Sequence, residues 1–434
     1  MADIMKIAVV GAGISGLSCA HRLVQAGQEV TLFEAGAYFG GHSHTVDLRL
    51  DGVTHAVDTG FLVFNHATYP NLVKLFEQLD VEAVDSHMSF SVKMPVGPGA
   101  GARVLEWAGG SLDTVFAQRS NLLRPRFLRM LRDILRFNRQ AGALALAGAA
   151  PDVPLGAFLD ANGYGATFRH WYLLPMAACI WSCPAEQMLA FPLSTFIRFC
   201  HNHGLLQVSD RPQWRTVRGG SRVYVEKLLA GIPDRRLASP VLSVRRLGGD
   251  GARSVALRSA AGTEHFDHVV MACHSDQSLA LLGDVRDDER AVLEAIRYQP
   301  NRAVLHTDTG CLPASRKAWS AWNYQGRAGA TPQVCVHYLI NLLQPLPRCR
   351  PVIVSLNPLD EPDPAQVHGE FAYSHPVFDA AAVAAQARLA TFQGRQHTWF
   401  AGAWTGYGFH EDGLKSGLAV AMALARTAAL DYAA

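Results

Sequence analysis

A glycine-rich segment near the N-terminus carries the residues best suited to bind a ligand. An uncharged run over 7–10 is followed directly by G-x-G-x-x-G, formed by Gly11, Ala12, Gly13, Ile14, Ser15 and Gly16. Such glycines let the backbone approach a pyrophosphate, and the N–H groups that open the next helix bind its charge. Glu34 follows about 20 residues later, where a carboxylate bonds a ribose hydroxyl. The pattern predicts binding of a dinucleotide with an unphosphorylated ribose.

Three local elements must position these groups. The β-branched run 7–10 predicts a strand buried on both faces, and 30–33 predicts a second strand. Between them, an apolar stripe with a 3.6-residue period predicts a helix that Gly27 ends. A glycine-rich turn that binds nothing is the alternative, and the motif alone does not choose between NAD and FAD.

Composition limits the class of protein. The 434 residues allow two or three domains, and a formal charge of +2 gives no reason to expect nucleic acid. No apolar run is long enough to cross a bilayer, and the first strand lies so close to Met1 that we expect no signal peptide. The eight cysteines contain no C-x-x-C, so we expect buried thiols, Cys179 and Cys183 among them, in a cytoplasmic protein.

Further segments resemble the flavin amine oxidase and phytoene desaturase superfamily. They are the double glycine after Glu34, the VDTG of 57–60, and a C-terminal A-G strand that leads into EDGLKSG at 411–417. The resemblance implies FAD, because the start of that last helix would face the flavin N1 and C2 carbonyl, a site for which NAD has no use. The residues it adds to the FAD site are Ala35, Gly40, Gly41, His42, Asp58, Gly60, Gly402, Glu411, Gly413 and Leu414.

Two positions depart from the family pattern. Gly36 and His42 stand where relatives usually carry arginine, so we expect backbone N–H groups to carry the pyrophosphate charge. His42 and His44 form an H-x-H pair, which raises the alternative of a metal site. No third ligand follows at a recognisable spacing, so we predict no metal and a loop or flavin-proximal role.

The middle of the chain predicts the remaining pieces of the fold. Residues 218–229 resemble the family's G-G turn and helix, and strands are expected over 240–245, 254–258 and 268–272, which place Val241 against the adenine and Ala272 beside the cofactor. We predict an α/β fold with a Rossmann-type FAD-binding domain, glutathione-reductase-like and of the amine oxidase subclass. It is assembled from 1–65, 218–281 and 396–434, and an interleaved α+β substrate domain takes 66–217 and 282–395.

A basic stretch over 124–139 is the strongest charge feature. Its arginines recur every three or four residues beside an apolar stripe of Phe127, Leu128, Leu131, Ile134 and Leu135. This is the pattern of a helix at a membrane interface, and equally of a surface helix packed on its own domain. We therefore consider both a cytoplasmic protein and one held peripherally on the inner face of the membrane.

Aromatic residues crowd two segments of the predicted substrate domain. Most are expected in the core, and a few are candidates for lining a substrate cavity. The residues concerned are Trp171, Tyr172, Met176, Trp181, Trp319, Trp322, Tyr324 and Tyr338.

A narrower resemblance concerns the substrate. GGHSHTVD from Gly40, PMAACIWSCP from Pro175, AWSAWNY from Ala318 and the segment from Thr398 resemble a bacterial group of predicted NAD/FAD-binding oxidoreductases. Members are often encoded beside cyclopropane-fatty-acyl synthase-like enzymes, and some are linked to methyl-fatty-acyl desaturation. The resemblance implies a desaturase or dehydrogenase that removes hydride from a lipid acyl chain to flavin N5.

The residues that would move a proton are less clear from the sequence. Tyr407 and His410 lie in the loop before the flavin-facing helix and are the candidates for the base, although both could only shape the loop. An amine oxidase, an FAD-dependent acyl-chain isomerase and a non-catalytic FAD-binding protein are the alternatives. No second G-x-G-x-x-G is present, so we expect electrons to leave to oxygen or quinone.

Overall fold

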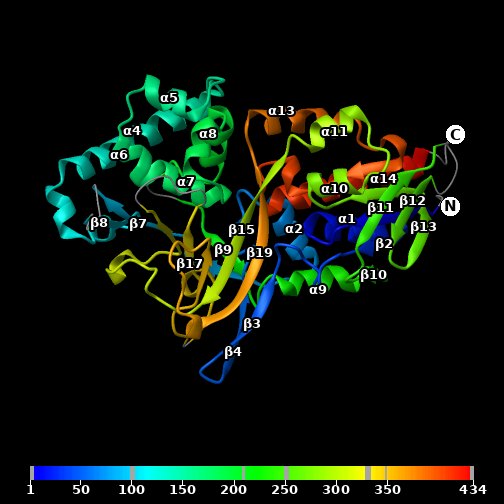
Figure 1. Ribbon diagram of the computed structural model, residues 1–434, viewed down its shortest axis with the longest axis horizontal. Helices are drawn as coiled ribbons and strands as arrows, with labels where there is room; N and C mark the ends of the chain where they lie inside the picture. Colours follow the sequence, from blue (N-terminus) through cyan, green and yellow to red (C-terminus); the bar gives the residue numbers. More distant parts are fainter. Residues whose placement is uncertain are drawn as a thin grey trace.

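The computed structural model describes residues 4–97, 103–207, 211–248, 254–327, 334–347 and 349–430. Figure 1 shows an elongated molecule with both termini at one end, beside β11 to β13. Helices α4 to α8 lie at the opposite end, and the long strands β15 and β19 run between the two.

A parallel sheet organises the end that holds the termini. Its strands, in spatial order, are β10 (Asp234–Arg236), β2 (Glu29–Phe33), β1 (Lys6–Val10), β14 (His268–Met271) and β20 (Thr398–Phe400). The last four residues of β1 are buried, as an uncharged β-branched run between two covered faces requires. All three predicted pieces of the cofactor domain contribute strands, and the Rossmann-type α/β prediction is confirmed.

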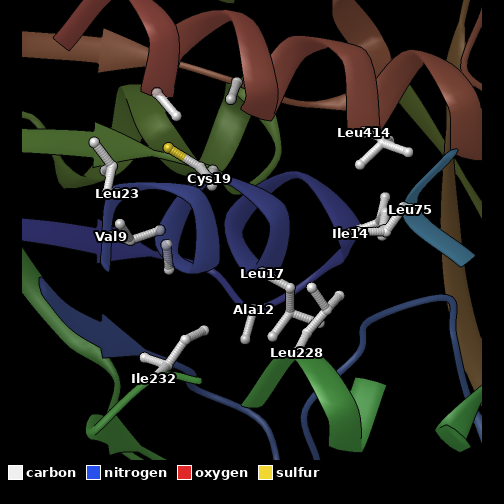
Figure 2. Packing of buried hydrophobic residues seen from close by; sticks show 14 of the residues in the cluster. Val9, Ala12, Ile14, Leu17, Cys19, Leu23, Leu75, Leu228, Ile232 and Leu414 are labelled. Atoms are coloured by element: carbon white, nitrogen blue, oxygen red, sulfur yellow. The ribbon is translucent and has the colours of Figure 1, made fainter. Parts of the chain in front are cut away.

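Helices pack on this sheet around α1 (Ile14–Gln25). In Figure 2, α14 (His410–Leu430) lies on one side of α1 and α9 (Arg222–Ala230) on the other. Leu17 faces Leu228 of α9, and Ile14 lies next to Leu414 and to Leu75 of α2 (Pro70–Gln78). The start of α1 is therefore fixed from three directions, by segments far apart in the sequence.

An antiparallel meander covers the other side of the sheet. It consists of β11 (Val241–Arg246), β12 (Val255–Ser259) and β13 (Gly262–Phe266). The sequence analysis did not predict the third strand, β13, whose polar residues show no buried run. Nearby helices are α10 (Ser275–Leu281), α11 (Asp287–Leu293) and α13 (Ala380–Arg388).

A larger mixed sheet lies in the half of the molecule away from the termini. Its order is β19 (Val367–Val377), β15 (Arg297–His306), β18 (Ile353–Leu356), β17 (Val336–Leu339), β16 (Trp322–Gln325), β7 (Phe90–Val96) and β8 (Arg103–Ala108). The helices of this half are α3 (Leu112–Val115), α4 (Pro125–Ala147), α5 (Leu155–Ala161), α6 (Ala166–Phe168), α7 (Leu174–Trp181), α8 (Leu193–Asn202) and α12 (Ile340–Leu343).

Two small sheets connect the halves. The hairpin β3 (Thr45–Leu50) and β4 (Val53–Asp58) is one, and β5 (Phe64–Asn65), β9 (Trp214–Val217) and β6 (Ala83–Ser86) form the other. The second sheet joins β5, which belongs to the predicted cofactor domain, to β6 and β9 of the predicted substrate domain, so it crosses the predicted limit at 65. Those limits stay a prediction.

Helix α4 divides the predicted apolar stripe between two environments. Phe127 is fully buried, and Leu131 and Ile134 pack against the interior. Leu128 and Leu135 are instead 43% and 59% exposed. Within the described residues, none of the helices combines the length and apolar composition needed to span a bilayer.

Candidate active site

A single continuous cavity of about 1050 Å³ runs from the glycine-rich segment into the half of the molecule that holds the larger sheet. Pockets that hold one small ligand typically measure about 300–1000 Å³. This cavity is therefore large enough for a cofactor at one end and a substrate at the other. We call these the cofactor end and the substrate end.

Backbone geometry at the cofactor end exposes N–H groups. Gly11 has φ +102, and a Cβ there would lie 2.8 Å from the carbonyl oxygen of Ala272, so the turn after β1 requires glycine. Gly13 is the N-cap of α1 and has no side chain to occupy the first N–H groups of the helix. A Cβ at Gly13 would meet no atom within 4 Å, because this position opens into the cavity. These are the features that a bound pyrophosphate requires.

Glu34 lines the cavity at the carboxyl end of β2. Its carboxylate accepts hydrogen bonds from the N–H groups of Ala12, at 2.9 Å, and Gly36, at 2.7 Å. The two bonds fix the carboxylate beside the glycine-rich loop, and each of its oxygens keeps a lone pair free. This orientation fits a ribose hydroxyl.

One ring nitrogen of His42 is buried in the cavity wall without a hydrogen bond to the described part of the chain. Its Nε2 is buried and has no hydrogen-bond partner among the described residues, and the side chain lines the cavity. Burial lowers the pKa of His42 well below its usual value, with His375 and His274 nearby adding to the effect, so the imidazole is neutral. In the part of the chain that the structure describes, no lysine or arginine lines the cofactor end. Backbone N–H groups and a neutral imidazole therefore face the place of the cofactor phosphates, and the residues present fit FAD.

Most of the predicted cofactor residues line this cavity. They are Gly11, Ala12, Gly13, Ile14, Ser15, Glu34, Ala35, Gly40, Gly41, His42, Gly60, Val241, Ala272 and Gly402. The structure adds Phe33, Ser239, Cys273, His274, Gln277, Ala403 and Trp404, which lie beside predicted positions along the chain. Adjacency to those positions was the only sequence signal for them.

The remaining predicted residues support the site from outside the lining. Asp58 is buried and accepts bonds from Thr45 Oγ1 at 2.5 Å and the N–H of Ser221 at 2.9 Å, which ties β4 to the turn before α9. Glu411 accepts the N–H groups of Asn71 and Leu72 at the start of α2. Gly16, Gly413 and Leu414 belong to the packing between α1 and its neighbours.

The structure separates the two candidate bases. His410 is buried and lines the cavity, with Nε2 2.9 Å from the Tyr224 hydroxyl and its ring stacked 3.9 Å from Phe61. Burial lowers the pKa of His410 to about 3, so the imidazole is neutral at ordinary pH. Tyr407 is not a lining residue and packs 6.2 Å from the Phe199 ring, centre to centre. Of the two, only His410 reaches the space where a substrate would lie.

Aromatic and aliphatic side chains line the substrate end. Of the aromatic-rich segments singled out in the sequence, Tyr172, Met176, Trp322 and Tyr338 line it, while Trp171, Trp181, Trp319 and Tyr324 do not. Residues that the sequence did not single out include Phe61, Tyr69, Trp107, Phe199, Trp214 and Phe409. No aspartate or glutamate lines this end in the described part of the chain.

The H-x-H pair does not form a ligand set. The Nδ1 atom of His44 bonds Thr59 Oγ1 at 3.0 Å, and its ring stacks on Tyr38, outside the cavity lining. In the described residues, potential ligand atoms gather instead at His306, Cys311 and His337, all within 4.8 Å of one another. Both imidazoles there already bond the Ser355 hydroxyl at 2.6 Å.

The parallel sheet, the open helix start and the oriented carboxylate define a dinucleotide-binding oxidoreductase of the Rossmann type. The sequence model of the family "Flavin containing amine oxidoreductase" matches residues 14–307, and the chain belongs to this family. The predicted superfamily, the FAD cofactor and the enzyme class are thereby confirmed. The protein is an FAD-dependent oxidoreductase.

Two curated relatives show how far the sequence similarity extends. Zeta-carotene desaturase of Synechocystis is 40% identical over 75 residues, which cover 17% of this chain and 14% of that protein. (S)-6-hydroxynicotine oxidase of Paenarthrobacter nicotinovorans is 25% identical over 307 residues, covering 65% of this chain and 69% of that protein. One relative is named for a desaturation and the other for an oxidase reaction, and the chain spans only part of each.

Solved structures share the fold over nearly the whole chain. Cyclohexylamine oxidase from Brevibacterium oxydans has a TM-score of 0.68 at 15% identity, covering 98% of this chain and 99% of that one. The CLA-producing fatty acid isomerase from P. acnes has a TM-score of 0.66 at 16% identity, covering 97% and 98%. At these identities the likeness concerns the fold alone.

Proposed function

We propose that the protein is a desaturase or dehydrogenase that removes hydride from an unsaturated or methyl-branched lipid acyl chain. The observation that carries the proposal is the lining of the substrate end, which is mostly aromatic and aliphatic, has Arg211 and His203 among its polar residues, and includes no carboxylate in the described residues. An apolar chain gains free energy on entering such a space, at roughly 25 cal/mol per Å² of apolar surface removed from water.

The same lining disfavours the amine oxidase alternative. A protonated amine placed here would lose its hydration without an opposite charge in return. Glu34 is the only carboxylate among the described residues of the lining, and two backbone N–H groups already bond it at the cofactor end. We therefore rank an acyl substrate above an amine.

FAD, when bound, supplies the oxidant that accepts the hydride. Forming a carbon–carbon double bond also releases a proton, and of the two candidate bases His410 is the one that lines the cavity. Its imidazole is neutral, and the Tyr224 hydroxyl, itself 2.5 Å from Ser43 Oγ, bonds Nε2 from the buried side. These bonds hold the ring in one orientation. Oxygen or quinone then takes up the two electrons.

The test is anaerobic reduction of the purified holoenzyme. We expect oleate or a methyl-branched acyl chain to bleach the flavin absorbance and to yield a product with one more double bond, while putrescine leaves the spectrum unchanged. Bleaching by putrescine alone would reverse the ranking. An acyl product with a shifted bond and no net oxidation would identify an isomerase, and no bleaching by any ligand would support a non-catalytic protein.

We further propose that α4 holds the enzyme against an anionic membrane, on the inner face. Leu128, Arg132, Leu135 and Arg139 are exposed at spacings of three and four, so they share one stripe of the helix. Leu146, 79% exposed, continues the stripe after two further turns. Exposed leucines can enter the acyl region while the arginines meet anionic headgroups. A cytoplasmic enzyme docked this way would receive its lipid from the bilayer.

A further inference from the structure

Among the described residues, the exposed part of the substrate-end lining carries one formal charge, that of Arg211, and we call this part the mouth. The exposed lining residues there are His87, Gly109, Gly110 and Arg211. The Gln213 side chain donates to the Ser86 carbonyl at 2.9 Å, so the segment that follows Arg211 lies against the residue that precedes His87. The pairing of Ser86 with Trp214 in the β6–β9 ladder fixes the same neighbourhood.

Within the described residues, the Arg211 guanidinium has one hydrogen-bond partner. Its Nε donates to the carbonyl of Gln207 at 2.9 Å, and no carboxylate of the described residues forms an ion pair with it. The two terminal nitrogens, four N–H groups in a planar fork, match an anionic oxygen pair. Its positive charge also acts on the Tyr172 hydroxyl deeper in the wall, opposing the rise that burial causes in the pKa of that tyrosine.

A row of rings leads inward from this mouth. Trp214, three residues from Arg211, lies 6.4 Å from Tyr69, measured between ring centres. Tyr69 lies 6.3 Å from Phe61, and Phe61 stacks 3.9 Å from His410. All of these side chains line the cavity. A molecule that follows them has its head at Arg211 and its apolar body directed toward His410.

We propose that Arg211 binds the anionic head of the substrate, a carboxylate or a phosphate, and thereby selects an acyl chain with a charged end over a neutral one. This inference rests on the proposed acyl substrate and adds the chemistry of its head. The guanidinium fixes how far the chain enters, so the bond presented to the reactive centre is set by its distance from the head. Arg211 is a specificity-determining residue of the substrate end.

The experiment compares three probes with the same 12-carbon chain: laurate, methyl laurate and dodecyl phosphate. Binding to the holoenzyme is measured by quenching of tryptophan fluorescence, since Trp107, Trp214 and Trp322 line the cavity. We expect the anions to bind roughly tenfold to a hundredfold more tightly than the ester, the range that hydrogen bonds to charged groups give. Arg211→Gln should remove this preference and leave the ester's affinity unchanged, and Arg211→Lys should restore part of it.

Arg218→Gln is the matched control, because Arg218 is exposed, pairs with Glu82 at 2.7 Å and lies outside the cavity lining. It should bind all three probes as the unchanged protein does. Tighter binding of laurate than of dodecyl phosphate would identify a free fatty acid as the source of the anion, and the reverse a lipid phosphate. Equal affinity for acid and ester in the unchanged protein would overturn the role of Arg211 and leave the acyl proposal standing. If none of the three probes bound, the proposed acyl substrate itself would be wrong, and the role of Arg211 would fall with it.

Discussion

The Tyr224 hydroxyl lies 2.9 Å from Nε2 of His410 and joins two elements almost 190 residues apart in the chain, α9 and the start of α14. Both side chains are buried, and the opposite face of the imidazole stacks on Phe61. The hydrogen bond and the stacking together allow the ring one orientation. The same ring lines the cavity, so its position is set before any substrate arrives.

The first prediction concerns the proton acceptor. His410→Ala should lower kcat about 100-fold or more, the usual contribution of a general base. Tyr224→Phe should cause a smaller loss, because the ring stays in place with one hydrogen bond fewer. Tyr407→Phe is the control and should leave kcat within about twofold, since Tyr407 does not reach the cavity. Steady-state kinetics decides, and a His410→Ala enzyme with more than a tenth of the activity would remove this histidine from the mechanism.

A second prediction separates folding from cofactor binding at two glycines. Gly13→Ala should leave the thermal stability of the apoprotein unchanged, because its Cβ meets no atom within 4 Å. The methyl group would occupy the approach of the pyrophosphate, so the affinity for FAD should fall at least tenfold. Gly11→Ala should instead unfold the protein at lower temperature, as φ +102 and the contact with the Ala272 carbonyl disfavour any side chain. Calorimetry of the apoprotein and FAD titration measure the two effects, and normal FAD affinity in Gly13→Ala would contradict the placement of the phosphates.

The third prediction concerns the contact of His42 with the cofactor, and His44 of the same H-x-H pair serves as the control. His42→Ala should weaken FAD binding by about tenfold, the value of roughly one hydrogen bond to a charged group. His44→Ala should leave the affinity unchanged, because His44 bonds Thr59 and lies outside the cavity lining. Quenching of flavin fluorescence during reconstitution gives both dissociation constants. Equal losses in the two variants would indicate a loop effect and not a contact with the cofactor.

The fourth prediction tests the exposed stripe of α4. The protein should sediment with vesicles of phosphatidylglycerol and much less with phosphatidylcholine. Arg132→Glu combined with Arg139→Glu should abolish the difference, and Leu128→Ser with Leu135→Ser should weaken binding to both. Arg218→Glu serves as a charge-reversal control at a site far from the stripe in sequence and paired with Glu82. Unchanged sedimentation of the double arginine variant would refute the docking proposal.

The fifth prediction follows from histidines buried in the neutral form. Burial lowers the pKa of His306 to about 4, and that of His337 and His410 to about 3. A histidine whose folded pKa lies below the unfolded value of about 6.5 takes up fewer protons when folded. Above the unfolded pKa, each of these histidines makes its full contribution to the free energy of unfolding. As the pH drops from the unfolded pKa toward the folded pKa, that free energy falls by about 1.4 kcal/mol per pH unit and per histidine.

Two buried carboxyl groups act in the opposite direction over part of this range. Burial raises the pKa of Asp58 and of Asp412 to about 6, so their ionisation opposes folding as the pH rises from about 4 to 6. The three histidines outnumber the two carboxyl groups, so acidification should destabilise the folded protein overall. Thermal melting should therefore occur at a lower temperature at pH 5 than at pH 7. His410→Gln keeps a polar partner for the Tyr224 hydroxyl and removes one titrating group, so the free energy of unfolding of this variant should fall by about 1.4 kcal/mol less per pH unit. An identical loss in this variant would be evidence against a neutral His410.

Much of the cofactor end could be read from the sequence because its signals are local. A strand, a glycine-rich turn and a helix adjoin one another along the chain, and each requires particular residues for its own backbone geometry. The residues over 11–15 and Glu34 were predicted from these signals to bind the cofactor, and the structure places them in the cavity lining. The family resemblance supplied the distant pieces, and the parallel sheet joins strands from all of them.

The substrate end depended on the tertiary structure. Nothing in the neighbourhood of Trp107, Trp214 or Arg211 distinguishes them in the sequence, and they meet only because β8, β9 and the segment before β9 surround one space. Tyr407 and His410 are equivalent by position, yet one turn of backbone directs His410 alone into the cavity. In the same way, neighbouring elements cover only part of the apolar stripe of α4 and leave Leu128 and Leu135 exposed. Periodicity shows which residues share a face, whereas only the packing of other elements determines whether that face meets protein, ligand or solvent.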